Sequence, residues 1–243
     1  GSARRGAGGP RGVDSLHRRD TVSPRALASR PSAGAAASPR DPPVLVMEWG
    51  MEFSVLMVCS GNIFRSPAAQ FLMVRELGAD PGVRVASAGT TPVLGHPVSR
   101  SMAELLRADG VDPRGHAARA LTMDLVREAD VVIGMTRAHR ARALSLWPDA
   151  HGRCFTLKEL DRLARDVSQD ELPSPAAGYE ERFAALVDIA SSQRGRGSEE
   201  DDIVDPVGQG PEVVQAVYKE LAESVDAVAR VVRGTRRRPR PSR

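Results

Sequence analysis

Apolar residues along the chain follow two patterns. Short runs rich in β-branched residues alternate with longer stretches in which apolar residues recur every three or four positions. The short runs predict strands over residues 54–58, 83–86, 130–134 and 153–156. The longer stretches predict helices over residues 66–77, 99–109, 122–128, 137–146, 157–165, 176–192 and 211–232. This alternation favours a parallel sheet with helices on both faces.

The two ends of the chain lack these patterns. Residues 1–46 contain six prolines and no hydrophobic period, so we expect a disordered basic arm, a folded domain over 47–233 and a basic tail over 234–243. The arm opens Gly-Ser, and Met47 and Met51 lie just before the first predicted strand. An expression or gene-start artefact is therefore an open interpretation of the arm. Within the domain, we expect residues 193–202 to form a mobile surface loop with a solvated acidic run at 199–202.

The formal net charge of +3 conceals an uneven distribution. Residues 1–40 hold eight arginines and two aspartates, residues 233–243 hold six arginines and no acid, and residues 41–232 hold 20 bases against 29 acids. The basic ends could neutralise nucleic-acid phosphates, but they contain no base-reading motif or interleaved aromatic residues. Nucleic-acid binding is therefore a less favoured alternative.

Cysteine content and apolar run length restrict the compartment. Cys59 and Cys154 are the only two cysteines, which excludes a disulfide framework and a four-cysteine zinc site and favours a reducing cytoplasm. The longest apolar runs fall far short of the ~20 residues that span a bilayer. The first forty residues also lack the apolar core of a signal peptide. We expect a cytoplasmic protein with no membrane partner.

The chemistry-bearing segment is Val-Leu-Met-Val-Cys-Ser-Gly-Asn-Ile-Phe-Arg-Ser-Pro at residues 55–67. A buried strand is predicted to end at Cys59, and Pro67 opens a helix at a position where its missing N–H costs nothing. Gly61 and Asn62 tolerate positive φ, so the turn between Cys59 and Pro67 can aim successive backbone N–H groups at one point. With the helix dipole and the Arg65 guanidinium, these donors favour a thiolate and a phosphate-sized oxyanion beside it. We call this turn the phosphate loop; its members are Ser60, Gly61, Asn62, Ile63, Phe64, Arg65 and Ser66.

A bare Cys-x5-Arg pattern is weak evidence for such a loop in a chain with 32 arginines. The full order is far more specific: a strand, the cysteine, Gly-Asn, Arg-Ser-Pro and then a helix. The segment closely resembles the Cys-x-Gly-Asn-x-x-Arg-Ser-Pro signature of bacterial low-molecular-weight protein tyrosine phosphatases. The resemblance extends over residues 53–232. It implies a three-layer α/β, flavodoxin-like fold with a four-stranded parallel sheet of order 2-1-3-4 and a site at the carboxyl end of the first strand.

The resemblance also implies residue roles. Cys59 would attack phosphorus, Arg65 would bind the phosphoryl oxygens, and Asp205 in the Asp-Pro pair before the last helix would be the general acid. Ser87 and His116 would hold Asn62. The enzyme would hydrolyse phosphotyrosine in proteins, or small aryl phosphates, through a phosphocysteine, with no metal and no organic cofactor. A helix-capping role for Asp205 and a surface-loop histidine at His116 are the structural alternatives; the oligomeric state stays open.

Departures from the family pattern bear on the substrate. Phe64 stands where the family often has a second cysteine, so an adjacent disulfide cannot protect Cys59. Val-Gly follows the Asp-Pro pair and residues 90–98 contain no aromatic, so an aryl ring would have weaker walls. Ile63 suits an aryl group better than a guanidinium, which favours phosphotyrosine over phosphoarginine or another phosphomonoester.

The remaining cysteine and histidines look structural. An arsenate reductase would need further cysteines to pass on a disulfide, and Cys154 on a predicted strand indicates packing instead. The loop or helix-surface histidines, His96, His139 and His151, show no metal-site spacing.

Overall fold

The computed structural model describes residues 52–78, 82–195 and 199–234. The predicted arm, and the predicted tail beyond Gly234, lie outside these ranges. The strands are β1 (Phe53–Cys59), β2 (Val83–Gly89), β3 (Val131–Gly134) and β4 (Cys154–Thr156). They form one parallel sheet of order β2-β1-β3-β4, which confirms the predicted fold. The helices are α1 (Arg65–Leu77), α2 (Arg100–Ala108), α3 (Met123–Glu128), α4 (Arg137–Leu146), α5 (Leu157–Asp166), α6 (Tyr179–Ser192) and α7 (Pro211–Arg233).

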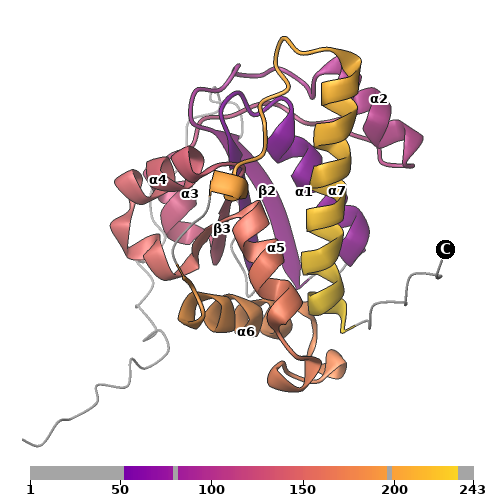
Figure 1. Cartoon of the computed structure of the whole chain (residues 1–243). Coiled ribbons are helices and arrows are strands. Elements are labelled where there is room, and N and C mark those ends of the chain that lie inside the picture. The colour runs from indigo at the N-terminus through magenta and orange to yellow at the C-terminus, as the bar shows by residue number, and fades with distance from the viewer. Residues whose placement is uncertain (1–51, 79–81, 196–198, 235–243) are drawn as a thin grey trace, which may run out of the picture. The chain divides into compact units, whose positions relative to one another are not determined.

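The residues of β1 alternate between the two faces of the sheet. Val55, Met57 and Cys59 pack in a core with residues of α1, α2, α5, α6 and α7. Leu56 and Val58 pack on the opposite face with residues of α3 and α4. Every residue of β1 is buried, as expected of a central strand covered by helices on both sides. Three layers result, with α3 and α4 on one side of the sheet and α1, α5 and α7 on the other (Figure 1).

Helix α6 lies across the amino end of the sheet, at the bottom of Figure 1. It starts at Tyr179, three residues later than predicted, because Gly178 before it has a φ of 93° and a short 3₁₀ turn occupies Pro175–Ala177. Phe183 of α6 stacks on Phe53, the first residue of β1, with ring centroids 4.9 Å apart. The helix therefore closes the end of the core opposite to the phosphate loop.

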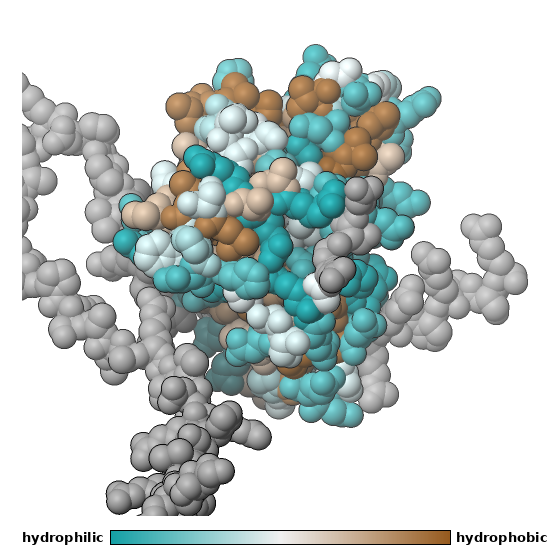
Figure 2. Space-filling view, turned by 60° about the vertical axis from the view of Figure 1, so that its left-hand side comes forward, coloured by the Kyte–Doolittle hydropathy of each residue, from teal (hydrophilic) through white to brown (hydrophobic). Residues whose placement is uncertain are grey.

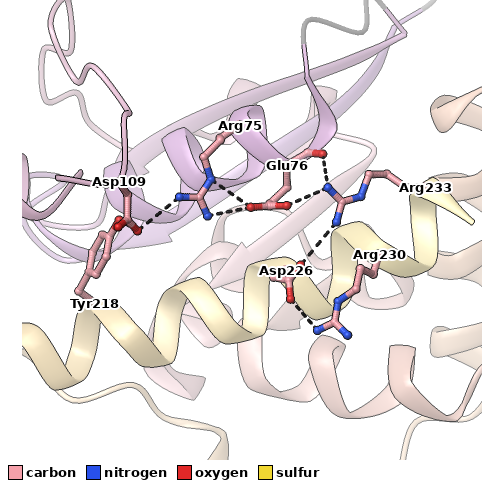
Figure 3. A network of polar contacts seen from close by, with 7 residues as sticks. All are labelled: Arg75, Glu76, Asp109, Tyr218, Asp226, Arg230 and Arg233. Carbon is pink, nitrogen blue, oxygen red and sulfur yellow. Dashed lines mark hydrogen bonds and ion pairs between the residues drawn. The ribbon is translucent and has the colours of Figure 1, made fainter. Parts of the chain in front are cut away.

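A polar network joins α1, the end of α2 and α7 (Figure 3). Tyr218 of α7 donates to Asp109 (2.7 Å), which also pairs with Arg75 of α1 (3.4 Å). Burial, followed by the hydrogen bond to Asp109, raises the pKa of Tyr218 above its usual range. Glu76 of α1 accepts from Arg233 near the end of α7 (2.8 Å). The network holds the helix that follows the phosphate loop against the last helix of the domain.

The fully buried guanidinium of Arg182 closes the carboxyl end of α7. It donates to the carbonyl oxygens of Val231 and Val232, to the carbonyl of Pro173 and to the side chain of Gln169. The last carbonyls of a helix have no partner within the helix and carry its negative dipole end, so a cation is favourable there. Arg182 thereby binds α6, α7 and the connection between α5 and α6 together.

We expect Arg182→Met to lower the free energy of unfolding by about 2–4 kcal/mol, because the carbonyl oxygens of Val232 and Pro173 and the side chain of Gln169 lose this donor. Urea denaturation followed by circular dichroism measures this. Arg100→Met on α2, where the side chain is largely exposed, is the matched control and should change stability by less than about 0.5 kcal/mol. Equal stability of the two variants would contradict the role assigned to Arg182.

Candidate active site

The phosphate loop turns its carbonyl groups away from its own centre. Backbone N–H groups of the segment after β2 donate to these carbonyl oxygens. The N–H of Thr90 donates to the carbonyl of Cys59 (2.9 Å), that of Thr91 to Ser60 (3.1 Å), that of Val93 to Gly61 (3.0 Å) and that of Ser99 to Ile63 (2.8 Å). Since the N–H and carbonyl of one trans peptide point in opposite directions, the loop N–H groups point inward, where they suit an oxyanion. Gly89 permits this contact, because a Cβ there would lie 2.4 Å from the Ser60 carbonyl oxygen.

The Cys59 sulfur is buried within this loop. Its Sγ lies 3.0 Å from Ser66 Oγ and 3.3 Å from the backbone nitrogen of Asn62, whose N–H donates to the sulfur. Asn62 Nδ2 donates to Ser66 Oγ (3.0 Å), and the Ser66 hydroxyl proton can point to the sulfur or to the more distant carbonyl oxygen of Ala88 (3.5 Å). The Asn62 backbone N–H and the Ser66 hydroxyl therefore both face Sγ.

Asn62 takes the left-handed conformation, with a φ of 54°, and is fully buried. Its Nδ2 donates to Ser87 Oγ (2.9 Å), and its carbonyl oxygen lies 2.8 Å from His116 Nε2. Its Oδ1 accepts from the backbone N–H of Arg119 (2.9 Å), a contact that sequence reasoning missed. Burial lowers the pKa of His116, and a carbonyl can only accept, so Nε2 is the protonated nitrogen. Asn62 is thus fixed through its side chain and its backbone.

Arg65 and Asp205 meet beside the loop although 140 residues separate them. The Nη2 of Arg65 lies 2.6 Å from Asp205 Oδ2, and its Nη1 donates to the carbonyl oxygen of Ile203 (2.9 Å). The arginine side chain is 4% exposed and the aspartate side chain 46%. Within the described ranges, the buried Nε–H of Arg65 has no acceptor. It remains available to an oxyanion.

Residues 201–206, which we call the acid segment, are attached to three other elements. The Ile203 N–H donates to the carbonyl of Met135, directly after β3 (2.9 Å). Asp202 accepts from the backbone N–H of Arg137 at the start of α4 (2.7 Å), and Asp201 pairs with Arg162 of α5 (3.2 Å). The expectation of a solvated acidic run is wrong at Asp201, which is 3% exposed. These two acidic residues anchor the segment that carries Asp205.

Comparison with known proteins shows the family. The sequence pattern described as low molecular weight phosphotyrosine protein phosphatase matches residues 54–194. The chain belongs to this family. The low molecular weight protein-tyrosine-phosphatase Etp of Escherichia coli is 32% identical over 130 residues, 54% of this chain and 82% of that protein. The probable phosphatase EpsP of Ralstonia solanacearum is 35% identical over 143 residues, 58% and 90% of the two chains.

Solved structures agree with this membership. The arginine phosphatase YwlE from Geobacillus stearothermophilus is 27% identical, with a TM-score of 0.53 over 73% of this chain and 90% of that one. The low molecular weight protein tyrosine phosphatase from T. tengcongensis is 25% identical, with a TM-score of 0.53 over 73% and 97%. The family pattern ends before Asp205, so the placement of this acid rests on the structure of this phosphatase.

Two residues outside the signature can now be placed in this phosphatase. His139 was expected in a loop or on a helix surface, but it is 6% exposed and lies 2.9 Å from Ser60 of the phosphate loop. Cys154 is fully buried in the core on the sheet face opposite to Cys59, and burial raises its pKa to about 11. A disulfide between these cysteines would need large backbone movement, which disfavours an arsenate reductase relay.

The mouth of the site is aliphatic. Val93 and Leu94 follow β2, Val204 and Val207 flank Asp205 and its proline, and all four are exposed. Figure 2 shows apolar surface gathered at the upper end of the domain, where α7 begins in Figure 1. Exposed aliphatic side chains therefore lie on both segments that contact the phosphate loop, the one after β2 and the one around Asp205.

Two further features concern membranes and metals. No helix within residues 52–78, 82–195 and 199–234 is both long and apolar enough to cross a bilayer. In the same ranges, no group of three or more His, Cys, Asp or Glu side chains could hold a metal ion.

We expect Asp202→Ala to lower kcat on phenyl phosphate by about 10-fold or more, because it releases the acid segment from α4 and misplaces Asp205. The loss on p-nitrophenyl phosphate, whose leaving group needs less protonation, should be smaller. Asp188→Ala on the exposed side of α6 is the control and should leave both rates unchanged. An unchanged kcat for Asp202→Ala would contradict the anchoring role.

Proposed function

We propose that this protein hydrolyses phosphotyrosine in proteins through a phosphocysteine intermediate. The observation that carries the proposal is the convergence of Cys59, Arg65 and Asp205: the sulfur accepts from the backbone N–H of Asn62 in a loop whose carbonyl groups point outward, and Asp205 lies 2.6 Å from Arg65 of that loop. Its partners would be phosphorylated proteins. Both cysteines are free, and a nucleophilic thiol must stay reduced, which supports a cytoplasmic location.

The first step transfers the phosphoryl group to sulfur. The Cys59 thiolate attacks phosphorus in line, an S–P bond forms, and the P–O bond to the tyrosine oxygen breaks. The Arg65 guanidinium and the loop N–H groups stabilise the charge on the equatorial oxygens. Asp205 gives its proton to the departing oxygen, which would otherwise leave as a phenolate. Substrate phosphate would replace Asp205 as the partner of Arg65.

The second step returns the sulfur to its starting state. Asp205, now a carboxylate, takes a proton from a water molecule whose oxygen attacks phosphorus. The S–P bond breaks and its electron pair returns to the sulfur. Ser66, 3.0 Å from Sγ, can donate to the developing thiolate and thereby makes the sulfur a better leaving group.

A covalent intermediate can be detected directly. Mass spectrometry of enzyme quenched within milliseconds of mixing with aryl phosphate should locate a phosphoryl group on the Cys59 peptide. Cys59→Ser should abolish turnover but retain phosphate binding, because Arg65 and the loop N–H groups remain. Cys154→Ser, which removes the other thiol from the opposite face of the sheet, should keep turnover within about twofold. Substantial turnover by Cys59→Ser would show that the nucleophile lies elsewhere.

The proton-donor role of Asp205 predicts a dependence on the leaving group. Tyrosine leaves as a phenol with a pKa of ~10, so its departure needs a proton, whereas nitrophenolate departs with little help. Asp205→Asn should lower single-turnover phosphorylation by about 10²–10⁴ on phenyl phosphate and by distinctly less on p-nitrophenyl phosphate. The predicted helix-capping alternative is wrong, because Gly210 precedes α7 and Asp205 instead accepts from the Val207 N–H (3.2 Å). Equal losses on both substrates, together with a lower melting temperature, would assign Asp205 only to this structural turn.

Phosphoarginine is the second candidate substrate. The likeness to an arginine phosphatase at 27% identity and the aliphatic mouth both favour it. Ile63 opposes it: this side chain lines the loop beside Gly61 and Val93 and has no polar atom to bind a guanidinium. The apolar side chain of Ile63 therefore favours phosphotyrosine, whereas the lack of aromatic walls favours phosphoarginine.

We expect wild-type protein to show a higher kcat/KM on a phosphotyrosine peptide than on a phosphoarginine peptide. Ile63→Thr should shift the ratio by about 10-fold toward phosphoarginine, because it adds a hydroxyl at the loop. Ile63→Val, which keeps the site apolar, is the control. A wild-type preference for phosphoarginine would reverse the assignment of the substrate but keep the mechanism.

A further inference from the structure

A second hydrogen-bonded chain reaches the phosphate loop from the side of β3 and α4. His139, in the first turn of α4, has Nε2 2.9 Å from Ser60 Oγ and Nδ1 2.9 Å from Thr136 Oγ1. Thr136 caps α4 and accepts the backbone N–H of His139 (3.3 Å). Gly134 makes room, since a Cβ there would lie 3.2 Å from the Cβ of His139. Ser60, half-buried, directly follows the Cys59 nucleophile.

The His139 ring is neutral at physiological pH. Burial and then the positive charge of Arg65 lower its pKa to about 4, while the negative charges of Asp205 and Asp202 oppose this shift. The charges that act on the ring thus come from α1 and from the acid segment. Because both also border the phosphate loop, His139 lies in the wall of the active site.

A neutral imidazole donates at one nitrogen and accepts at the other. With the proton on Nε2, His139 donates to Ser60 and accepts from the Thr136 hydroxyl, so the Ser60 hydroxyl proton is available to a third group. With the proton on Nδ1, Ser60 must donate to Nε2, and its oxygen can only accept from other groups. A phosphoryl group in the loop carries acceptors alone, so its binding selects the first arrangement.

We propose that Thr136, His139 and Ser60 form a hydrogen-bond relay that makes the Ser60 hydroxyl an additional donor to the phosphoryl group. Ser60 then touches the substrate, and His139 and Thr136 are positioning residues that act through it. The proposal rests on the proposed function in one respect: the phosphoryl group occupies the phosphate loop. No proton is transferred in the relay; only the direction of three hydrogen bonds is fixed.

The relay is tested first by the binding of vanadate, measured by calorimetry on the full chain. Ser60→Ala should weaken binding by about 10- to 100-fold, the effect of one hydrogen bond to a charged group, and Ser60→Thr should restore it to within about threefold. The same change in kcat/KM should appear on phenyl phosphate and p-nitrophenyl phosphate, because the donor acts on the phosphoryl group and not on the leaving group. Unaltered vanadate binding by Ser60→Ala would overturn the proposal.

The coupling between the residues is tested by a double-mutant cycle. His139→Leu should weaken vanadate binding by about 3- to 10-fold in wild type and by less than about twofold in the Ser60→Ala background. His139→Gln should recover part of the loss, because its amide N–H₂ can donate to Ser60. His151→Gln, at an exposed histidine, is the control. An equal loss from His139→Leu in both backgrounds would show that His139 does not act through Ser60.

Nitrogen-15 NMR of the histidine rings in wild-type protein tests the direction of the relay's hydrogen bonds without any substitution. In the vanadate complex, Nε2 of His139 should carry the proton and Nδ1 should not. A protonated Nδ1 in that complex would overturn the relay. Absence of phosphatase activity in wild type would refute the proposed function instead, whereas the binding and NMR results decide the relay without turnover.

Discussion

The site depends on the outward direction of five successive carbonyl groups, from Cys59 to Ile63. Four accept from the segment after β2, and the carbonyl of Asn62 accepts from His116. A loop with any of these carbonyls turned inward would place a negative dipole end where an oxyanion must bind and would leave a carbonyl without a donor. The buried side chain of Asn62, the absence of a Cβ at Gly89 and the path of residues 90–99 all serve this one requirement.

Asp205 is brought to this loop by elements near the carboxyl edge of the sheet. Met135 after β3, Arg137 at the start of α4 and Arg162 of α5 each bind the acid segment. The network of Figure 3 in turn holds α7, which follows this segment, against α1, which follows the phosphate loop. Cys59, Arg65 and Asp205 are therefore positioned by packed helices rather than by the loops alone.

Local patterns predicted the parallel sheet and the contents of the phosphate loop, and the family resemblance implied the strand order. The signature is contiguous, and the apolar runs of β1, β2 and β3 stand out between polar stretches. The contact of Ser60 with His139 crosses 79 residues and depends on β3 lying beside β1, so no local pattern contains it. One signal was available: Thr136-x-x-His139 follows a predicted strand, and the carboxyl ends of parallel strands meet at one edge. The burial of Asp201 gave no such signal, because an acidic run in a polar stretch usually faces solvent.

The connection between β4 and the acid segment has a modular character. Its helix α6 lies at the amino end of the sheet, where Phe183 stacks on Phe53 and Arg182 closes the end of α7. The residues that hold the acid segment, by contrast, lie directly after β3, in α4 and in α5. Residues on the exposed side of α6, such as Asp188, can therefore change during evolution without moving Asp205, whereas the buried Arg182 and Phe183 are held by α7 and by the core.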